Sequence, residues 1–106
     1  MTFNVAWSHD KPENYIRKFG SIVELSLYTL KNNPIAEGDM IASVPAAFRP
    51  KYVVNACMLG IGATYGNGIA IVNIQTDGTM TLSYIVEHRN ENAWRWVVGK
   101  VLYIAD

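Results

Sequence analysis

Two prolines close together constrain the fold of this chain more than any other feature. Pro45 and Pro50 lie in the segment Ile41–Pro50, at the end of a short apolar run. Each proline lacks a backbone N–H and pushes the residue before it toward extended geometry, so the segment can be neither a regular helix nor an inner strand of a sheet. The segment is therefore predicted to be an extended, irregular crossing between two regions of sheet.

Elsewhere the chain shows the two-residue alternation of strands and no helical periodicity. Alternation is clearest in Ile22–Tyr28, where Val23, Leu25 and Leu27 alternate with Glu24, Ser26 and Tyr28. This pattern is typical of a half-buried strand. Asp77-Gly78 separates two alternating segments and predicts a tight hairpin, because this pair tolerates positive φ angles. No segment requires a helix. Further strands are predicted near Thr2–Trp7, Asn14–Phe19, Met40–Ser43, Tyr52–Leu59, Ile69–Gln75, Thr79–Val86 and Ala93–Ile104.

Short strands with turn signals at intervals of about ten residues predict an all-β fold, an antiparallel β-sandwich or a jelly-roll-like domain. A chain of 106 residues supports one core, so residues 1–106 are expected to form a single domain. The glycine-dense stretch Gly60–Gly68 lacks the Lys-Ser/Thr ending of a phosphate-binding loop. It is interpreted as a flexible or bulged connection between strands.

Composition excludes several classes of protein. Half of the residues are hydrophobic, which excludes disorder, and nine scattered basic residues balance nine acidic ones, which argues against a nucleic-acid partner. No apolar run is long enough for membrane insertion, and the start Met1–Asn4 lacks the pattern of a signal peptide, so the protein is expected to be made in a cytosol and to stay soluble. The single cysteine, Cys57, lies in an apolar run and is expected to be a buried thiol.

Four short motifs occur in a distinctive order. Tyr15–Leu27 has a tyrosine, a basic pair, a hydrophobe, a glycine and then V-x-L-x; Ile41–Pro50 ends in Pro-x-x-Phe-Arg-Pro; Ile71–Leu82 contains V-x-I-x-x-D-G; and the closing strand ends near Tyr103. This order, over most of the chain, resembles the small β-sandwich modules that end tail-fibre, baseplate and receptor-binding proteins of bacteriophages and prophages. The chain departs from that pattern at Val44, where leucine is common, and at Ala46-Ala47, where a glycine is common.

The resemblance implies a function as well as a fold. It implies a non-enzymatic module of a tail or baseplate that contributes to recognition of a host cell surface, through binding of cell-wall saccharide. It further implies a homotrimer that contacts other tail or baseplate proteins and is located in the virion after assembly in the bacterial host cytoplasm. Many copies of a weak saccharide site would together give firm attachment.

A cluster of polar and aromatic residues near the end of the chain is the predicted saccharide site. Trp94 and Trp96 are expected to point the same way from one strand and to offer flat platforms for a sugar ring, beside polar groups that bond its hydroxyls. The predicted site consists of Glu87, His88, Arg89, Asn90, Trp94 and Trp96. The alternative is that both tryptophans are core or subunit-interface residues and that the polar stretch is a solvated hairpin tip.

Catalytic and metal chemistry find little support in the sequence. His9 and His88 lack the three or four convergent ligands of a metal site. No two carboxylates are nominated as the facing pair that glycan hydrolysis requires, and no serine has an activating context. We therefore expect no metal, no cofactor and no enzymatic activity, with a tail-associated hydrolase as the least favoured alternative.

Aromatic residues are abundant for so small a chain, with three Trp, six Tyr and three Phe. Tyr15, Arg17 and Phe19 are expected to share one face of a strand, and some aromatic surface is expected between subunits. The main alternative to saccharide recognition follows from this surplus. It is a purely structural module that trimerises or docks onto another tail protein, with Trp94, Trp96 and Tyr103 buried between subunits.

Overall fold

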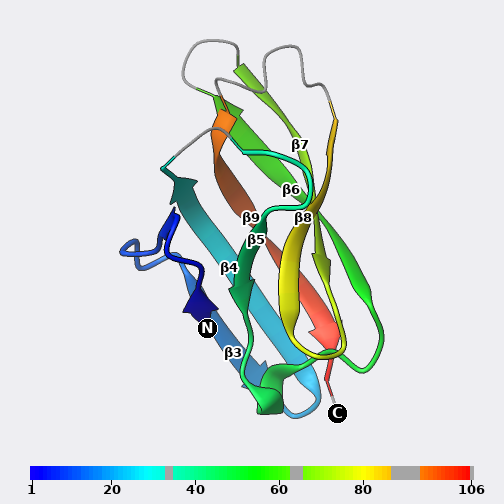
Figure 1. The fold of residues 1–106 in the computed structure, drawn as a ribbon. Helices are drawn as coiled ribbons and strands as arrows, with labels where there is room; N and C mark the ends of the chain where they lie inside the picture. The colour runs from blue at the N-terminus through cyan, green and yellow to red at the C-terminus, as the bar shows by residue number, and fades with distance from the viewer. Residues whose placement is uncertain (33–34, 63–65, 87–93, 106) are drawn as a thin grey trace.

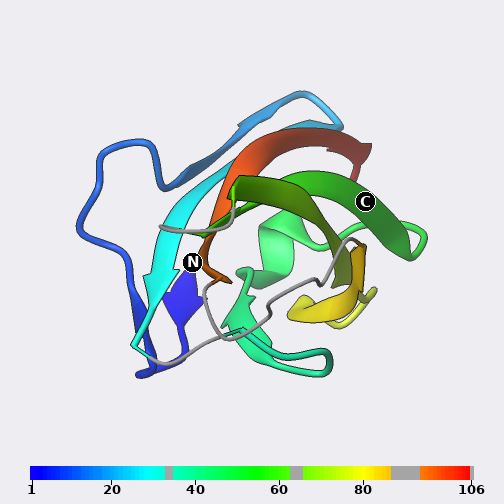
Figure 2. The same cartoon turned by 90° about the horizontal axis from the view of Figure 1, so that it is seen from above.

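The computed structural model describes residues 1–32, 35–62, 66–86 and 94–105, although the side chains at 66, 67, 86, 94 and 95 are not described. This part of the chain forms an antiparallel sheet that is nearly closed into a barrel (Figures 1 and 2). The all-β, antiparallel class predicted from the sequence is confirmed. The strands are β1 (Thr2–Phe3), β2 (Trp7–Ser8), β3 (Tyr15–Phe19), β4 (Ile22–Lys31), β5 (Met40–Ser43), β6 (Val54–Gly62), β7 (Gly66–Ile74), β8 (Thr79–Val86) and β9 (Trp94–Ile104).

Eight strands follow one another around the sheet in the order β1-β5-β8-β7-β6-β9-β4-β2, and β3 also pairs with β4. The turn between β1 and β2 joins the two ends of this order. On one side the Asn4 N–H donates to the Ile41 carbonyl, and on the other the Asn32 N–H donates to the Ala6 carbonyl, each at 2.9 Å. This turn also divides the single strand predicted over Thr2–Trp7 into two, because the Trp7 N–H donates to the Asn4 carbonyl.

The core lies inside the barrel and follows the predicted alternation. Val23, Leu25 and Leu27 of β4 are at most 1% exposed, as a half-buried strand requires. The side chains at the inward positions of the other long strands are buried in the same core. The fully buried side chains of greatest volume are Leu25, Leu27, Ile35, Ile41, Ile74, Met80, Leu82, Ile85, Val23, Val72 and Val97.

The proline segment crosses between strands that are not neighbours, as predicted. It links β5 to β6, and Pro50 forms an isolated bridge with Ala105 beyond the end of β9. The expectation of an extended path throughout is wrong in one detail, because a 3₁₀ helix, η1 (Ala46–Phe48), lies between the prolines. Pro45 can precede this turn for two reasons. No backbone N–H is needed at that position, and the fixed φ of proline is compatible with the start of a helix.

The Asp77-Gly78 hairpin is also present and contacts the proline segment. Gly78 has a φ of 91°, and the Thr79 N–H donates to Asp77 Oδ1 at 2.9 Å, which lowers the pKa of the Asp77 carboxyl. The Val44 N–H donates to the Gly78 carbonyl at 3.0 Å. The two strongest signals in the sequence therefore specify two segments that pack against each other.

Two sequence expectations about β6 need correction. Cys57 is exposed, so the predicted buried thiol is wrong; Ala56 and Met58 take the inward positions of β6 and alternation places Cys57 outside. The glycine-dense stretch is largely strand, since Gly60 pairs with Gly68 and Gly62 with Gly66, and residues 63–65 of the connection lie outside the described part. No helix in the described residues is long and apolar enough to cross a membrane.

Candidate functional site

Most of the predicted saccharide site lies outside the described residues. This applies to Glu87, His88, Arg89 and Asn90 and to the side chain of Trp94. The site as predicted from the sequence therefore remains a prediction. Trp96 is the one member whose side chain is described.

Trp96 is half-buried on β9, where its backbone pairs with Leu30 of β4 and Ile61 of β6. Its ring meets the Tyr28 ring edge-to-face, with centroids 5.3 Å apart and planes at 72°. The pairing with β6 shifts register here, because Ile61 lies opposite Trp96 and Gly62 opposite Trp94. The extra residue is a β-bulge, and a bulge interrupts the strict alternation on which the expectation of one shared tryptophan face depended.

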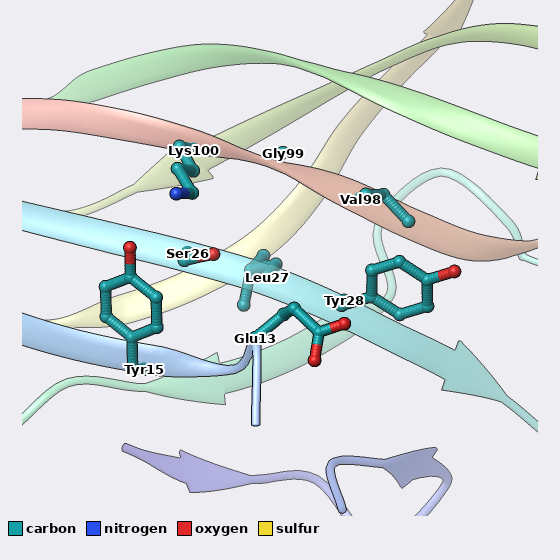
Figure 3. Close-up of a pocket in the computed structure, with 8 residues that line it drawn as sticks. All are labelled: Glu13, Tyr15, Ser26, Leu27, Tyr28, Val98, Gly99 and Lys100. Atoms are coloured by element: carbon teal, nitrogen blue, oxygen red, sulfur yellow. The ribbon is translucent and has the colours of Figure 1, made fainter. Parts of the chain in front are cut away.

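A pocket of about 240 Å³ opens on the outer face of the barrel beside Tyr28 (Figure 3). It is somewhat smaller than the range of roughly 300–1,000 Å³ that drug-sized ligands occupy, so it suits one small ring. Tyr15 and Tyr28 stand on its two sides in Figure 3. The lining residues are Glu13, Tyr15, Ser26, Leu27, Tyr28, Val98, Gly99 and Lys100.

Strand register brings these residues together from three parts of the chain. Ser26 of β4 pairs with Tyr15 of β3 on one side and with Lys100 of β9 on the other, and Tyr28 pairs with Val98. These positions alternate with Leu25 and Leu27 in the core, so they form the outer face. Ser26 is nevertheless only 2% exposed, although it lines the pocket.

Arg17 and Lys100 both approach the Tyr15 ring. The Arg17 guanidinium carbon is 4.4 Å and Lys100 Nζ is 5.6 Å from the ring centroid. Arg17 Nε also donates to Glu24 Oε1 at 2.7 Å, and this bond lowers the pKa of the Glu24 carboxyl. The Tyr15 hydroxyl is buried without a hydrogen bond of normal geometry, although it is near enough to Glu24 to contribute to the same lowering.

Asn14 holds the loop that carries Glu13 against β4. Its side-chain amide donates to the Tyr28 carbonyl at 2.8 Å and accepts from the Tyr28 N–H at 2.7 Å. The amide thus replaces the strand pairing that β3 no longer supplies beyond Tyr15. This bidentate contact fixes Glu13 at one rim of the pocket.

The sequence predicts the strand face that carries Tyr15, but it does not predict a ligand site there. It placed Tyr15, Arg17 and Phe19 on one face of a strand, and the register confirms this, because their partners Ser26, Glu24 and Ile22 share the outer face of β4. It did not single out Glu13, Ser26, Tyr28 or Lys100. Ser26 and Tyr28 at outward positions of β4 were the available signal, but spacing alone does not show which strands flank β4.

The described residues offer little for metal or acid–base chemistry. They contain no group of three or more His, Cys, Asp or Glu side chains placed to hold a metal ion. The His9 ring instead stacks on Phe3, with centroids 4.8 Å apart. Glu13 is the single carboxylate among the described residues that line the pocket, whereas glycan hydrolysis commonly uses two.

Tyr103 lies inside its own subunit, which corrects one element of the structural alternative. It is 7% exposed, and its hydroxyl donates to the Phe48 carbonyl at 2.6 Å. Burial raises the pKa of Tyr103 to about 12. Its aromatic ring therefore joins β9 to η1 and is not available between subunits.

A second outer surface, which we call the apolar face, covers β6, β7 and β8. Its rows are set by register, with Leu59 opposite Ile69, Cys57 opposite Ile71 and Ile71 opposite Tyr84. Leu59 and Ile69 are each 41% exposed and Tyr84 is 51% exposed. The apolar face is defined as Cys57, Leu59, Ile69, Ile71 and Tyr84, none of which is charged.

Compared with known proteins, the chain matches no protein-family model and no curated protein sequence.

Proposed function

We propose that this chain is a non-catalytic module of a phage or prophage tail or baseplate, of β-sandwich or jelly-roll type, that binds a saccharide unit of a host cell surface. The order of motifs from Tyr15 to Tyr103 supports the tail assignment. The pocket between Tyr15 and Tyr28 is the observation that supports saccharide binding.

The chemistry of the pocket suits one sugar ring. Aromatic side chains provide flat apolar surfaces for the C–H faces of a sugar, while their hydroxyls and neighbouring polar groups bond its oxygens. Tyr15 and Tyr28 supply such surfaces, and Ser26 adds a hydroxyl at the base.

This proposal moves the centre of the site away from the stretch predicted from the sequence. Trp96 keeps a role, because its ring contacts Tyr28 and supports that wall of the pocket. Glu87, His88, Arg89, Asn90 and Trp94 remain candidates for further contacts with a longer glycan.

The test is a titration of the purified chain with fragments of bacterial cell-wall glycan, followed by NMR. Tyr15→Ala and Tyr28→Ala are each expected to weaken binding by about fivefold to tenfold, the loss of one aromatic contact. Tyr52→Ala is the matched control, since Tyr52 is 70% exposed and does not line the pocket. Equal affinity of all three variants and the parent chain would exclude this pocket as the saccharide site.

The second proposal is the structural alternative, a module that forms a homotrimer without binding saccharide. The apolar face supports it, because Leu59, Ile69 and Tyr84 are exposed together and the face carries no charge that would repel a second copy. Light scattering distinguishes the possible states. A mass of three chains with no glycan binding favours this proposal, and a stable monomer argues against it.

A further inference from the structure

We infer that the pocket selects a zwitterionic sugar unit, with the ligand's ammonium group at Glu13 and its anionic group at Lys100. This inference rests on the proposed saccharide function and specifies the ligand class.

The first observation is that the rim holds one charge of each sign. Among the described residues, neither the Glu13 carboxylate nor the Lys100 ammonium has a hydrogen-bond or ion-pair partner, although the Lys100 ammonium lies over the Tyr15 ring. Both residues are exposed and line the pocket. Both charged groups are therefore available to a ligand.

The second observation is that the two charges are held on opposite sides of β4. Glu13 precedes β3, which pairs with one edge of β4, and Lys100 is on β9, which pairs with the other edge. Two strand spacings separate the flanking backbones by roughly 10 Å. Figure 3 shows the floor of the pocket between them, so a ligand on Ser26 has a carboxylate on one side and an ammonium on the other.

The third observation explains why Lys100 stays available. Glu24 is the carboxylate whose pKa responds to the charge of Lys100, but Glu24 already accepts the Arg17 bond at 2.7 Å. Arg17 matches a carboxylate better than lysine does, because its planar guanidinium presents several donors in a fixed geometry. The Arg17–Glu24 pair leaves Lys100 as the cation that faces the pocket.

The aromatic walls reinforce the selection at the Glu13 side. A ligand ammonium beside Glu13 would lie on the side of the pocket that Tyr28 forms, because the Glu13 side chain points toward Tyr28 in Figure 3. A cation close to a tyrosine face is stabilised by the ring quadrupole. The Tyr15 ring, in contrast, already has Arg17 and Lys100 near it, so the anionic end of the ligand fits that side.

Four related compounds test the inference: glucose, glucosamine, glucose 6-phosphate and glucosamine 6-phosphate. They carry no charge, the ammonium alone, the phosphate alone, and both. We expect glucosamine 6-phosphate to bind at least about fivefold more tightly than glucose, with the singly charged compounds between them. Glu13→Gln should remove the advantage of the ammonium only, and Lys100→Met the advantage of the phosphate only.

Glu37→Gln and Lys51→Met are the matched controls, because both positions are exposed and neither lines the pocket. Equal affinities of the four compounds would overturn the inference and leave the saccharide proposal standing. Binding of wall glycan that is unchanged by Glu13→Gln and Lys100→Met would also overturn it. Failure of all four compounds and of wall glycan to bind would overturn both proposals.

Discussion

The two outer faces of this barrel are built from the same kind of strand but differ in shape and charge. The face of β3, β4 and β9 is hollowed by the pocket and carries Arg17, Glu24 and Lys100, with Glu13 at the rim. The apolar face on β6, β7 and β8 carries no charge at its five defining positions. One surface suits a small polar ligand, and the other suits a second protein surface.

The difference arises from what flanks each set of strands. Beside β4, the chain adds β3 and the Glu13 loop, and Asn14 ties that loop to Tyr28 with two hydrogen bonds. This added segment supplies two of the residues that line the pocket, Glu13 and Tyr15. The pocket therefore depends on the segment that precedes and forms β3.

The largest expected effect comes from placing a charge on the apolar face. If this face joins copies of the chain, Ile69→Asp buries an unpaired carboxylate at each contact, which costs about 3 kcal/mol or more and weakens association by over 100-fold. Light scattering should then show the mass falling from three chains to one. The pocket should keep its glycan affinity.

Thr76→Asp is the control for Ile69→Asp, since Thr76 is exposed in the hairpin after β7 and outside the apolar face. An oligomer that survives Ile69→Asp would place the subunit contact elsewhere. The patch of Phe19, Ile22, Leu102 and Ile104, which are 42–67% exposed, would then be the next surface to test.

The next largest effect is expected at Gly99, where the pocket meets the core. A Cβ at this position would lie 2.9 Å from Met58 Cγ and 3.1 Å from Met58 Cβ on β6. Gly99→Val should therefore destabilise the fold by about 1–3 kcal/mol through overpacking, as measured by urea unfolding. Both outer faces should be disturbed together, because the strain acts between β9 and β6.

Met58→Ala is the partner variant that makes this experiment specific. It removes Met58 Cγ, the atom that a new Cβ would approach most closely, and keeps Cβ, so the double variant should lose less stability than the two single losses added together. Simple additivity of the two losses would show that Met58 is not the reason for glycine at position 99.

The fold could be predicted in outline because its main determinants are local. Alternation on β4 identified the core positions Val23, Leu25 and Leu27, and the Asp77-Gly78 pair identified a hairpin that needs a φ of 91°. These signals depend on neighbouring residues in the chain. The prediction of a buried Cys57 is wrong because apolar neighbours in the sequence do not decide burial in a strand, which places alternate members of the run outside.

The pocket could not be predicted because it depends on which distant strands are neighbours. Tyr15, Ser26 and Lys100 form one row only because β4 lies between β3 and β9. Period-two alternation says that Ser26 faces outward, but not what lies beside it. The bulge between Trp94 and Trp96 also could not be predicted from the sequence, because it arises from the pairing of β9 with β6.

A smaller effect is expected for Tyr103, which is buried and joins β9 to η1. Tyr103→Phe removes the hydrogen bond to the Phe48 carbonyl and should cost about 1 kcal/mol in urea unfolding at pH 8. Because the folded pKa is raised from 10.0 to about 12, the folded state holds this proton more tightly. The resulting stability is complete below pH 10 and is lost as the pH rises toward about 12.

Tyr103→Phe should therefore make the decline in stability between pH 10 and 12 less steep than in the parent chain. Tyr52→Phe is the control, since Tyr52 is 70% exposed. The same decline in the parent chain and in Tyr103→Phe would contradict the assignment of a buried, proton-retaining phenol.

The smallest expected effect is for Arg17→Met. This variant tests whether the Arg17 charge, or packing alone, positions the Tyr15 side of the pocket. Arg17→Met removes the cation 4.4 Å from the Tyr15 ring and the donor to Glu24. The pKa of the Glu24 carboxyl should rise toward its ordinary value, which NMR of the carboxyl carbon can follow.

Because Tyr15 loses one of the contacts that orient it in Arg17→Met, glycan affinity should fall by about twofold to threefold. Lys11→Met removes another exposed positive charge that makes neither contact, and it should change neither quantity. If Arg17→Met raises the Glu24 pKa but leaves glycan affinity unchanged, packing and not the Arg17 charge holds the Tyr15 ring in place. The face with the pocket would then differ from the apolar face in shape and not in the role of this charge.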